Sequence, residues 1–274
     1  MTKLLLLANT DWYLYNFRLS LAKRMVAEGW EVVLASPPGK YSRMFEQNGL
    51  HWIPFALSSR NFSPLREIWS IAKIIQIYIK EKPTITHHFT IKCVIYGSIA
   101  ARITRTKYCI NAITGRGHIF TNKGMRVLLI KPVIKFLYKI LLQNPTYRVI
   151  FQNDEDKDFF VSNGLAKPQL THVIRGSGVN CTKFKPTKRP KKPNKNYVRI
   201  LFASRLIREK GIFELYYAAI RTRHKGIRAH YIIAGDIYQG NPTSLNESDL
   251  KMISKEKNIT YIGHVEDMPK IIDK

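Results

Sequence analysis

Long uncharged apolar runs are missing from this sequence of 274 residues. None is as long as the roughly 18 residues that a membrane-spanning helix requires, and the nearest stretch, residues 127–142, carries Lys131, Lys135 and Lys139. The apolar run in MTKLLLLANTDW is short, and Asp11 follows it without a small-residue cleavage pattern. It predicts a buried first strand rather than a signal peptide. We therefore expect no segment that spans a bilayer.

Cysteine clusters and metal-ligand patterns are missing as well. Cys93, Cys109 and Cys181 are scattered, without the pairing of a disulfide framework or the CxxC spacing of a zinc site. The histidines also lack metal-ligand spacing, and neither a GxSxG nor a paired-carboxylate motif occurs. These absences predict that the protein has no metal site and no cofactor, and that it occupies a reducing cytoplasm.

Acidic residues are scarce, with 19 Asp and Glu against 45 Lys and Arg, for a formal net charge of +26. Residues 83–152 contain no acidic residue at all. The cations in and beside this tract are Lys82, Lys92, Arg102, Arg105, Lys107, Arg116, Lys123, Arg126, Lys131, Lys135, Lys139 and Arg148. So large an excess predicts an acidic partner, such as phosphate groups or an anionic membrane.

Three of these cations, Lys131, Lys135 and Lys139, recur every four residues and would form a stripe along one helix beside many apolar residues. The pattern predicts a helix that docks peripherally on the anionic inner face of the plasma membrane. A core-packing helix with solvated lysines is the plainer alternative. Nucleic acid is a rival anion, although no zinc-finger, RRM or basic-zipper pattern supports specific binding.

Short apolar runs alternate with segments of helical period, as in residues 3–8, 17–29 and 31–36. The pattern continues at residues 84–88, 107–113 and 147–151 and restarts at 198–204, 211–223, 230–235, 248–257 and 259–263. Such alternation predicts βαβ units and parallel sheets. The basic, proline-containing residues 183–197 predict a linker. The sequence thus predicts an α/β protein with domains at 1–182 and 198–274, the second holding only half of a doubly wound sheet.

The loop within FASRLIREKGIFEL (202–215) is the sharpest chemical signal. A predicted strand ends at Ser204 and a helix begins near Gly211, which is where α/β folds bind anions. Arg205 and Lys210 lie in this loop and could hold a diphosphate and stabilise its charge as a leaving group. On spacing alone, two solvated surface cations are the simpler interpretation.

The same stretch resembles the R-x(4)-KG signature of family 4 glycosyltransferases, the retaining GT-B enzymes of bacterial polysaccharide and lipid-linked oligosaccharide synthesis. Similar blocks follow in the same order: NTDWYLYNFRLSLAKRM (9–25), HHFTIKCVIYGSIAARI (87–103), INAITGRGHIFT (110–121), VIFQNDEDKDFFVSNGL (149–165), VIRGSGVN (173–180) and YIGHVEDMP (261–269). The resemblance implies a GT-B fold of two Rossmann-like domains and transfer of a sugar from a nucleotide-diphosphate sugar to a membrane-associated, lipid-linked glycan acceptor.

The resemblance also implies roles for particular residues. Arg205 and Lys210 match the basic pair that binds the donor diphosphate. A backbone segment that lies near the nucleotide base in the family corresponds to Gly263, His264 and Val265. In the loop after the first strand, which faces the interdomain cleft in GT-B enzymes, the acceptor-side candidates are Asn9, Thr10, Asp11, Asn16 and Arg18. That loop has no glycine, unlike the glycine-rich loop common in the family, so direct phosphate contact by its backbone is not implied.

His88, His118 and Arg175 are further candidates. A lone histidine is more often structural than catalytic, and His88 at a predicted strand end could serve capping or packing. His118 ranks above it, because TGRGH follows a predicted strand and the family often has a cleft residue there that touches the transferred sugar. Arg175 could face the same cleft, and the glycines of RGSGVN predict a tight turn with positive φ.

The family also implies a pair of glutamates, spaced E-x(7)-E, in segments beyond those matched here. A chain truncated in its C-terminal domain would lack them. Two hypotheses therefore stand side by side: a working transferase of cell-surface polysaccharide synthesis, and a catalytically inactive truncated remnant that binds anionic lipid or a glycan precursor.

Overall fold

The computed structural model describes residues 1–57, 63–115, 120, 125–185, 198–238, 241 and 243–273. The chain forms two compact units, Met1–Gly178 and Val179–Lys274. The domain boundary predicted after residue 182 falls close to this division. The linker predicted at 183–197 lies mostly outside the described residues, so it stays a prediction.

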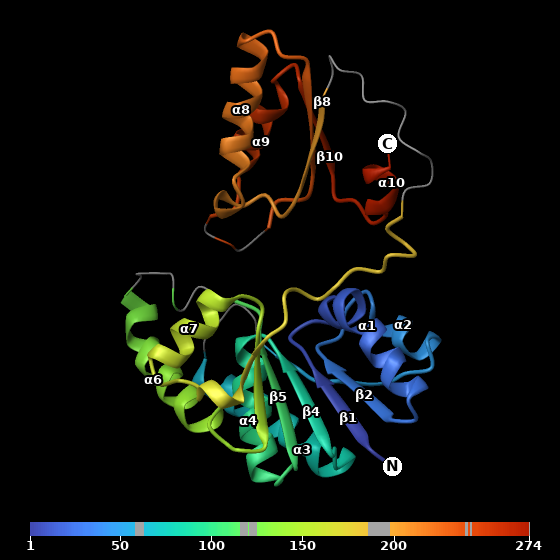
Figure 1. Ribbon diagram of the computed structural model, residues 1–274, viewed down its shortest axis with the longest axis vertical. Coiled ribbons are helices and arrows are strands. Elements are labelled where there is room, and N and C mark those ends of the chain that lie inside the picture. Colours follow the sequence, from blue (N-terminus) through green and yellow to red (C-terminus); the bar gives the residue numbers. More distant parts are fainter. Residues whose placement is uncertain are drawn as a thin grey trace. The chain divides into compact units, whose positions relative to one another are not determined.

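The first unit is built on a seven-stranded, wholly parallel sheet in the order β3-β2-β1-β4-β5-β6-β7 (Figure 1). The strands are β1 (Lys3–Leu7), β2 (Glu31–Ser36), β3 (His51–Pro54), β4 (Ile85–Phe89), β5 (Tyr108–Ile113), β6 (Tyr147–Phe151) and β7 (Thr171–Val173). The strands predicted from the apolar runs near residues 3, 31, 84, 107 and 147 are therefore confirmed.

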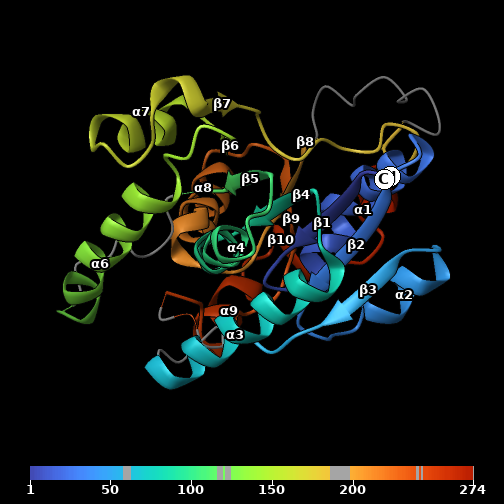
Figure 2. The ribbon, with the colours of Figure 1, turned by 90° about the horizontal axis from the view of Figure 1, so that it is seen from below.

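Helices cover both faces of this sheet because successive strand residues point to opposite sides. Leu4 and Leu6 of β1 pack with α1 (Asp11–Ala27) and α2 (Ser42–Gln47). Leu5 and Leu7 pack in a second core with α3 (Pro64–Glu81), α4 (Ile91–Ile103), α6 (Met125–Leu141) and α7 (Asp154–Ser162). Figure 2 shows α3 and α4 side by side beneath the sheet.

The helix caps follow from the sequence. The Thr10 hydroxyl accepts the Tyr13 N–H at 3.1 Å and begins α1 directly after β1. The Asn153 side chain caps α7 in the same way, and three acidic residues occupy the first turn of that helix. Oxygen-bearing side chains at these positions satisfy amide groups that have no partner within the helix. Both α1 and α7 therefore begin at the carboxyl edge of the sheet.

The second unit holds a three-stranded parallel sheet in the order β10-β9-β8. Its strands are β8 (Val198–Ala203), β9 (Ala229–Ala234) and β10 (Ile259–Gly263), and its helices are α8 (Ile212–His224), α9 (Glu247–Ser254) and α10 (Met268–Ile272). A short 3-10 turn, Arg208–Lys210, precedes α8. The α/β class predicted for this part of the chain is confirmed, whereas the half-sheet interpretation stays a prediction. No helix among the described residues is long and apolar enough to cross a bilayer.

Candidate functional site

The order of the first sheet reverses between β1 and β4, and the loops that leave these two strands lie at the same edge. Asn9 and Thr10 follow β1, whereas Thr90 follows β4 with a φ of 72°. Open parallel sheets bind ligands outside the carboxyl ends of their strands at such a reversal. Two of the predicted acceptor-side residues, Asn9 and Thr10, are thus placed at the point where this fold type carries its sites.

Asp11 faces into the unit. One carboxylate oxygen, Oδ2, accepts the Tyr41 N–H at 2.7 Å and the Ser42 hydroxyl at 3.1 Å, while Oδ1 accepts the Trp12 N–H at 2.7 Å. The side chain is buried. Asp11 therefore holds the loop after β2 against the start of α1. Its substrate-binding role stays a prediction, and the structure adds a positioning role that the sequence did not indicate.

Arg18 lies on α1 against the end of β4. Its guanidinium carbon sits 4.3 Å from the centre of the Phe89 ring, and Nη2 donates to the Tyr13 hydroxyl at 2.9 Å. The His87 ring lies 4.1 Å from that of Phe89. Asn16, by contrast, is exposed and donates to the Trp12 carbonyl at 2.9 Å.

Two nitrogens of this group, Nε of Arg18 and Nε2 of His87, are buried without a hydrogen-bond partner. Burial lowers the pKa of His87 well below its usual value, and the positive charge of Arg18 adds to this. A neutral imidazole beside a cation provides both a neutral and a charged polar group at the switch point. The sequence singled out Arg18 but not His87. The only sequence feature that indicated a site at His87 was its position one residue before the end of a predicted strand.

His88 is enclosed on the opposite face of β4. Its Nδ1 lies 2.8 Å from Oδ1 of Asn111 and its Nε2 lies 2.5 Å from the Tyr78 hydroxyl, and the ring has no exposed surface. The Gly97 backbone packs so closely that a Cβ there would overlap the ring. Burial lowers the pKa of His88 to about 4. This arrangement supports the packing interpretation and provides no direct contact with a substrate.

Arg175 lies just past β7, where it pairs with Asp154 at 2.9 Å at the start of α7. Both partners are well exposed. Gly176 and Gly178 have φ values of 71° and 72°, which confirms the predicted turn. His118 lies outside the described residues, so its predicted contact with the transferred sugar stays a prediction.

In the second unit, the loop between β8 and α8 lies at the carboxyl edge of the sheet. Arg205 follows β8 and stacks 4.9 Å from the centre of the Tyr238 ring, and Lys210 ends the 3-10 turn directly before α8. Both cations are exposed. Gly211 begins α8 with a φ of 81°, a conformation that favours glycine. The strand-loop-helix context predicted for Arg205 and Lys210 is therefore confirmed, whereas their ligand is not tested.

The other strand ends of this unit meet through their backbones. The Gly235 N–H donates to the Gly263 carbonyl at 2.8 Å, and a Cβ on Gly235 would overlap the Ser204 carbonyl oxygen. Gly263 ends β10 with a φ of 70°, and His264 and Val265 follow it. Arg205 follows β8 and Gly263 ends β10, and because β9 separates these two strands they are roughly 10 Å apart. That span suits an extended ligand along one edge.

Tyr238, which stacks on Arg205, was missed by the sequence reasoning. It lies in the loop that follows β9, and the rule that drew attention to the loop after β8 applies equally to this one. An aromatic side chain beside a cation at a strand-end loop is typical of nucleotide sites, although an exposed Tyr is not distinctive in sequence. No group of His, Cys, Asp and Glu suited to a metal ion occurs among the residues that the structure describes.

Helix α6 carries the three lysines that were predicted to contact a membrane, and that contact stays a prediction. Four large apolar side chains are exposed and recur along the helix: Leu129, Val133, Phe136 and Ile140. Of the three predicted membrane-binding lysines, Lys139 is exposed, whereas Lys131 and Lys135 are only half-exposed on the flank of the helix.

Contacts with neighbouring residues hold those two flanking lysines. Lys131 lies 6.0 Å from the ring centre of Phe120, and Lys135 lies 5.9 Å from that of Phe159 and donates to Asn163 at 3.0 Å. The helix rotates so because Ile134 and Tyr138 fill the core. Among the residues of α6 whose side chains the structure describes, the helix therefore turns an apolar face to solvent, and Lys139 is exposed as well.

A comparison with known protein families assigns this chain to a family. A family model described as "Glycosyl transferase 4-like" matches residues 3–153, which is more than half of the chain and includes the β1–β4 switch point. This chain belongs to the glycosyl transferase 4-like family. The family resemblance predicted from the six sequence blocks is confirmed.

Curated relatives of this glycosyl transferase 4-like chain include bacterial glycosyltransferases. It is 28% identical over 246 residues to the capsular polysaccharide biosynthesis glycosyltransferase CapM of Staphylococcus aureus, covering 86% of this chain and 62% of CapM. It is 25% identical over 234 residues to N,N'-diacetylbacillosaminyl-diphospho-undecaprenol alpha-1,3-N-acetylgalactosaminyltransferase of Campylobacter jejuni, covering 81% and 60% of the two chains. The chain thus spans about three fifths of the length of these curated relatives.

Among solved structures, Anabaena HepE in complex with UDP and glucose superposes with a TM-score of 0.69 at 18% identity, covering 100% of this chain and 72% of HepE. At this level of identity the likeness establishes the fold. The predicted GT-B class is therefore confirmed.

Proposed function

We propose that this family member transfers a sugar from a nucleotide-diphosphate sugar to a lipid-linked glycan acceptor, with retention of anomeric configuration, in cell-surface polysaccharide synthesis. The observation that carries the proposal is the pair of exposed cations, Arg205 and Lys210, in the loop that feeds α8. The names of the Campylobacter relative and of an Escherichia coli galactosyltransferase, which is 29% identical over 127 residues, both specify diphospho-undecaprenol substrates.

The proposed chemistry uses the loop after β8 as a diphosphate site. As the bond between the anomeric carbon and the donor diphosphate breaks, negative charge grows on the leaving oxygen. The acceptor hydroxyl oxygen forms the new bond to the anomeric carbon, and its proton passes to the leaving diphosphate. Arg205 and Lys210 stabilise that charge, and the first amide groups of α8 add a helix dipole of the favourable sign. Gly263, His264 and Val265 would lie beside the nucleoside, and Tyr238 offers a ring for stacking.

On the first unit, we propose that the acceptor contacts the β1–β4 switch point through Asn9, Thr10, Asn16 and Arg18. Arg18 brings a cation with an unpartnered buried Nε, which suits a diphosphate or a sugar hydroxyl. Asp11 and Arg175 would support this edge, since each bonds to a neighbouring loop or helix start. His118 remains a proposed contact to the transferred sugar.

The decisive experiment is turnover by this chain, with UDP, GDP and ADP sugars offered alongside undecaprenyl-diphosphate-linked sugars. We expect transfer that falls about 100-fold or more in Arg205→Ala, because removing one charge-stabilising donor costs that much in comparable sites. Lys225→Ala, an exposed lysine at the far end of α8, is the matched control and should retain full activity. If UDP and other nucleotides bind Arg205→Ala and the parent equally well, the diphosphate role fails.

We also propose that α6 holds the protein on an anionic leaflet. The exposed apolar face would enter the interface while Lys139 meets headgroups, each cation contributing about 1 kcal/mol. Sedimentation with phosphatidylglycerol vesicles should weaken strongly in Phe136→Glu and modestly in Lys139→Glu. Tyr217→Glu, an equally exposed aromatic position on α8, serves as the control. If Phe136→Glu sediments with vesicles as well as the parent protein does, α6 does not contact the membrane.

A further inference from the structure

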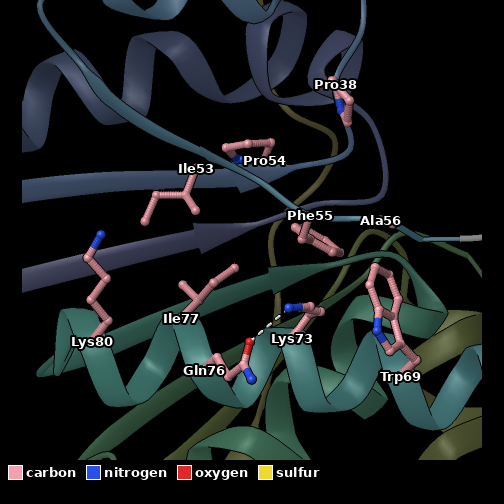
Figure 3. A pocket seen from close by; sticks show the side chains of 10 residues that line it. All are labelled: Pro38, Ile53, Pro54, Phe55, Ala56, Trp69, Lys73, Gln76, Ile77 and Lys80. Carbon is pink, nitrogen blue, oxygen red and sulfur yellow. Dashed lines mark hydrogen bonds between the residues drawn. The ribbon is translucent and has the colours of Figure 1, made fainter.

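A groove of about 480 Å³ lies between the edge strand β3 and helix α3 (Figure 3). Ile53 and Phe55 line the strand side, and Trp69 and Ile77 line the helix side. This volume is within the range of small-ligand sites. The sequence reasoning did not find the groove, because it forms only when β3 and α3 pack together.

The lining of the groove is mostly apolar. Phe55 and Ile77 are buried, while Trp69 is half exposed and has the Lys73 ammonium 5.5 Å from its ring centre. Just outside the groove, Leu65 and Ile68 of α3 expose 80% and 64% of their surface, so apolar surface continues from the groove onto the first turns of the helix. The apolar lining suits the apolar part of a ligand.

The polar atoms of the groove are concentrated along α3. Lys73 and Lys80 line it at positions two turns apart, and Lys73 donates to Gln76 at 3.2 Å (Figure 3). The lining residues include no carboxylate. From Trp69 to Lys80 the helix rises roughly 16 Å. The groove is thus an elongated apolar channel with cations at the middle and at one end.

The direction in which this channel runs, from its apolar end to its charged end, distinguishes it from the proposed acceptor site. Trp69, Phe55 and Pro38 lie near the carboxyl ends of β2 and β3, whereas Lys80 lies in the last turn of α3, just before the chain returns to the amino end of β4. An amphiphile whose phosphate met Lys80 would point its head away from the edge that holds Asn9 and Thr10. Such a molecule occupies the groove without presenting its headgroup to the proposed reaction.

We propose that the β3–α3 groove binds a single hydrocarbon chain of an anionic lipid, with the lipid phosphate against Lys80. The apolar lining removes the chain from water, and the Lys80 ammonium complements the head. The site is separate from the proposed transferase site, so either can fail while the other stands. It would let lipid bind to the first unit one molecule at a time, unlike adsorption through α6.

The test uses monomeric single-chain lipids with the whole chain, below the concentration at which they form micelles. Titration calorimetry with 1-myristoyl-lysophosphatidylglycerol should show one site, whereas glycerol 3-phosphate, which has no chain, should not bind. The zwitterionic lysophosphatidylcholine of equal chain length should bind about tenfold more weakly, as each tenfold step is 1.4 kcal/mol.

Three variants locate the site. Gln76→Phe fills the groove from an exposed helix position and should weaken binding of both lipids at least about tenfold. Lys80→Glu should weaken the anionic lipid by a similar factor and leave the zwitterionic one nearly unchanged. Lys23→Glu on α1, an exposed lysine outside the groove, and Phe136→Glu on α6 should leave both affinities unchanged.

Three outcomes would overturn the proposal. The first is failure of the anionic lysolipid to bind the parent protein. The second is equal affinity in Gln76→Phe and the parent, with thermal unfolding showing that both are folded. The third is a concentration-dependent dimer that Gln76→Phe disrupts, which would assign the groove to a second copy of the chain.

Discussion

The carboxyl edges of the two sheets are held in different ways. In the first unit, side chains fix the strand ends: Asp11 bonds across to the loop after β2, and His88 bridges Tyr78 and Asn111. In the second unit, backbones meet directly, with Gly235 bonded to Gly263 and no room for a Cβ beside Ser204. The stability of the first unit should therefore depend on pH and on its buried polar side chains. The stability of the second unit should depend on the absence of a side chain at Gly235.

The largest expected effect is on the second edge. Gly235→Ala places a Cβ onto the Ser204 carbonyl oxygen and should lower the free energy of unfolding of this unit by roughly 4 kcal/mol. Gly263→Ala is the matched control, because its positive φ carries a cost of about 1–2 kcal/mol but its Cβ meets nothing within 4 Å. Urea unfolding measures both. Equal losses in the two variants would mean that close backbone approach does not hold this edge.

The next effect is the pH dependence of the first edge. Burial lowers the pKa of His88 to about 4, whereas an unfolded histidine titrates near 6.5. The unfolded chain therefore binds the proton first, and stability falls as pH drops from about 6.5 to 4, by about 3 kcal/mol in all. His87, whose pKa burial also lowers, adds to the same slope.

His88→Gln tests that assignment, since glutamine keeps hydrogen-bonding groups without titrating in this range. Urea unfolding at pH 7 and pH 5 should show a smaller difference in the variant than in the parent. His172→Gln, at an exposed position of β7, should keep the parent difference. A pH slope that survives in His88→Gln would assign the titration elsewhere.

A smaller effect is expected at Asp11. Asp11→Asn replaces one acceptor oxygen of a buried carboxylate that receives three hydrogen bonds, so unfolding should become easier by about 2 kcal/mol. Asp154→Asn breaks only the exposed pair with Arg175 and should cost under about 1 kcal/mol. If both substitutions cost the same, the first edge does not depend on its buried carboxylate.

Much of the fold followed from the sequence because local pattern specifies it. Short apolar runs such as residues 31–36 predict buried strands, and segments of helical period such as 211–223 predict helices. The position of Arg205 and Lys210 followed in the same way, since a loop between a parallel strand and its helix always leaves at the carboxyl edge. Collinear motifs then gave the family, which the match over residues 3–153 established.

Only the tertiary structure decided which side of each helix or strand is buried and which faces solvent. The spacing of Lys131, Lys135 and Lys139 predicted that they lie along one side of a helix. The core contacts of Ile134 and Tyr138 set the rotation of α6, so that apolar side chains of this helix face solvent. The position of His88 at a strand end was equally visible, yet packing by Tyr78, Gly97 and Asn111 decided that it faces inward. Periodicity defines faces relative to one another, and only contacts between distant segments choose the face that is buried.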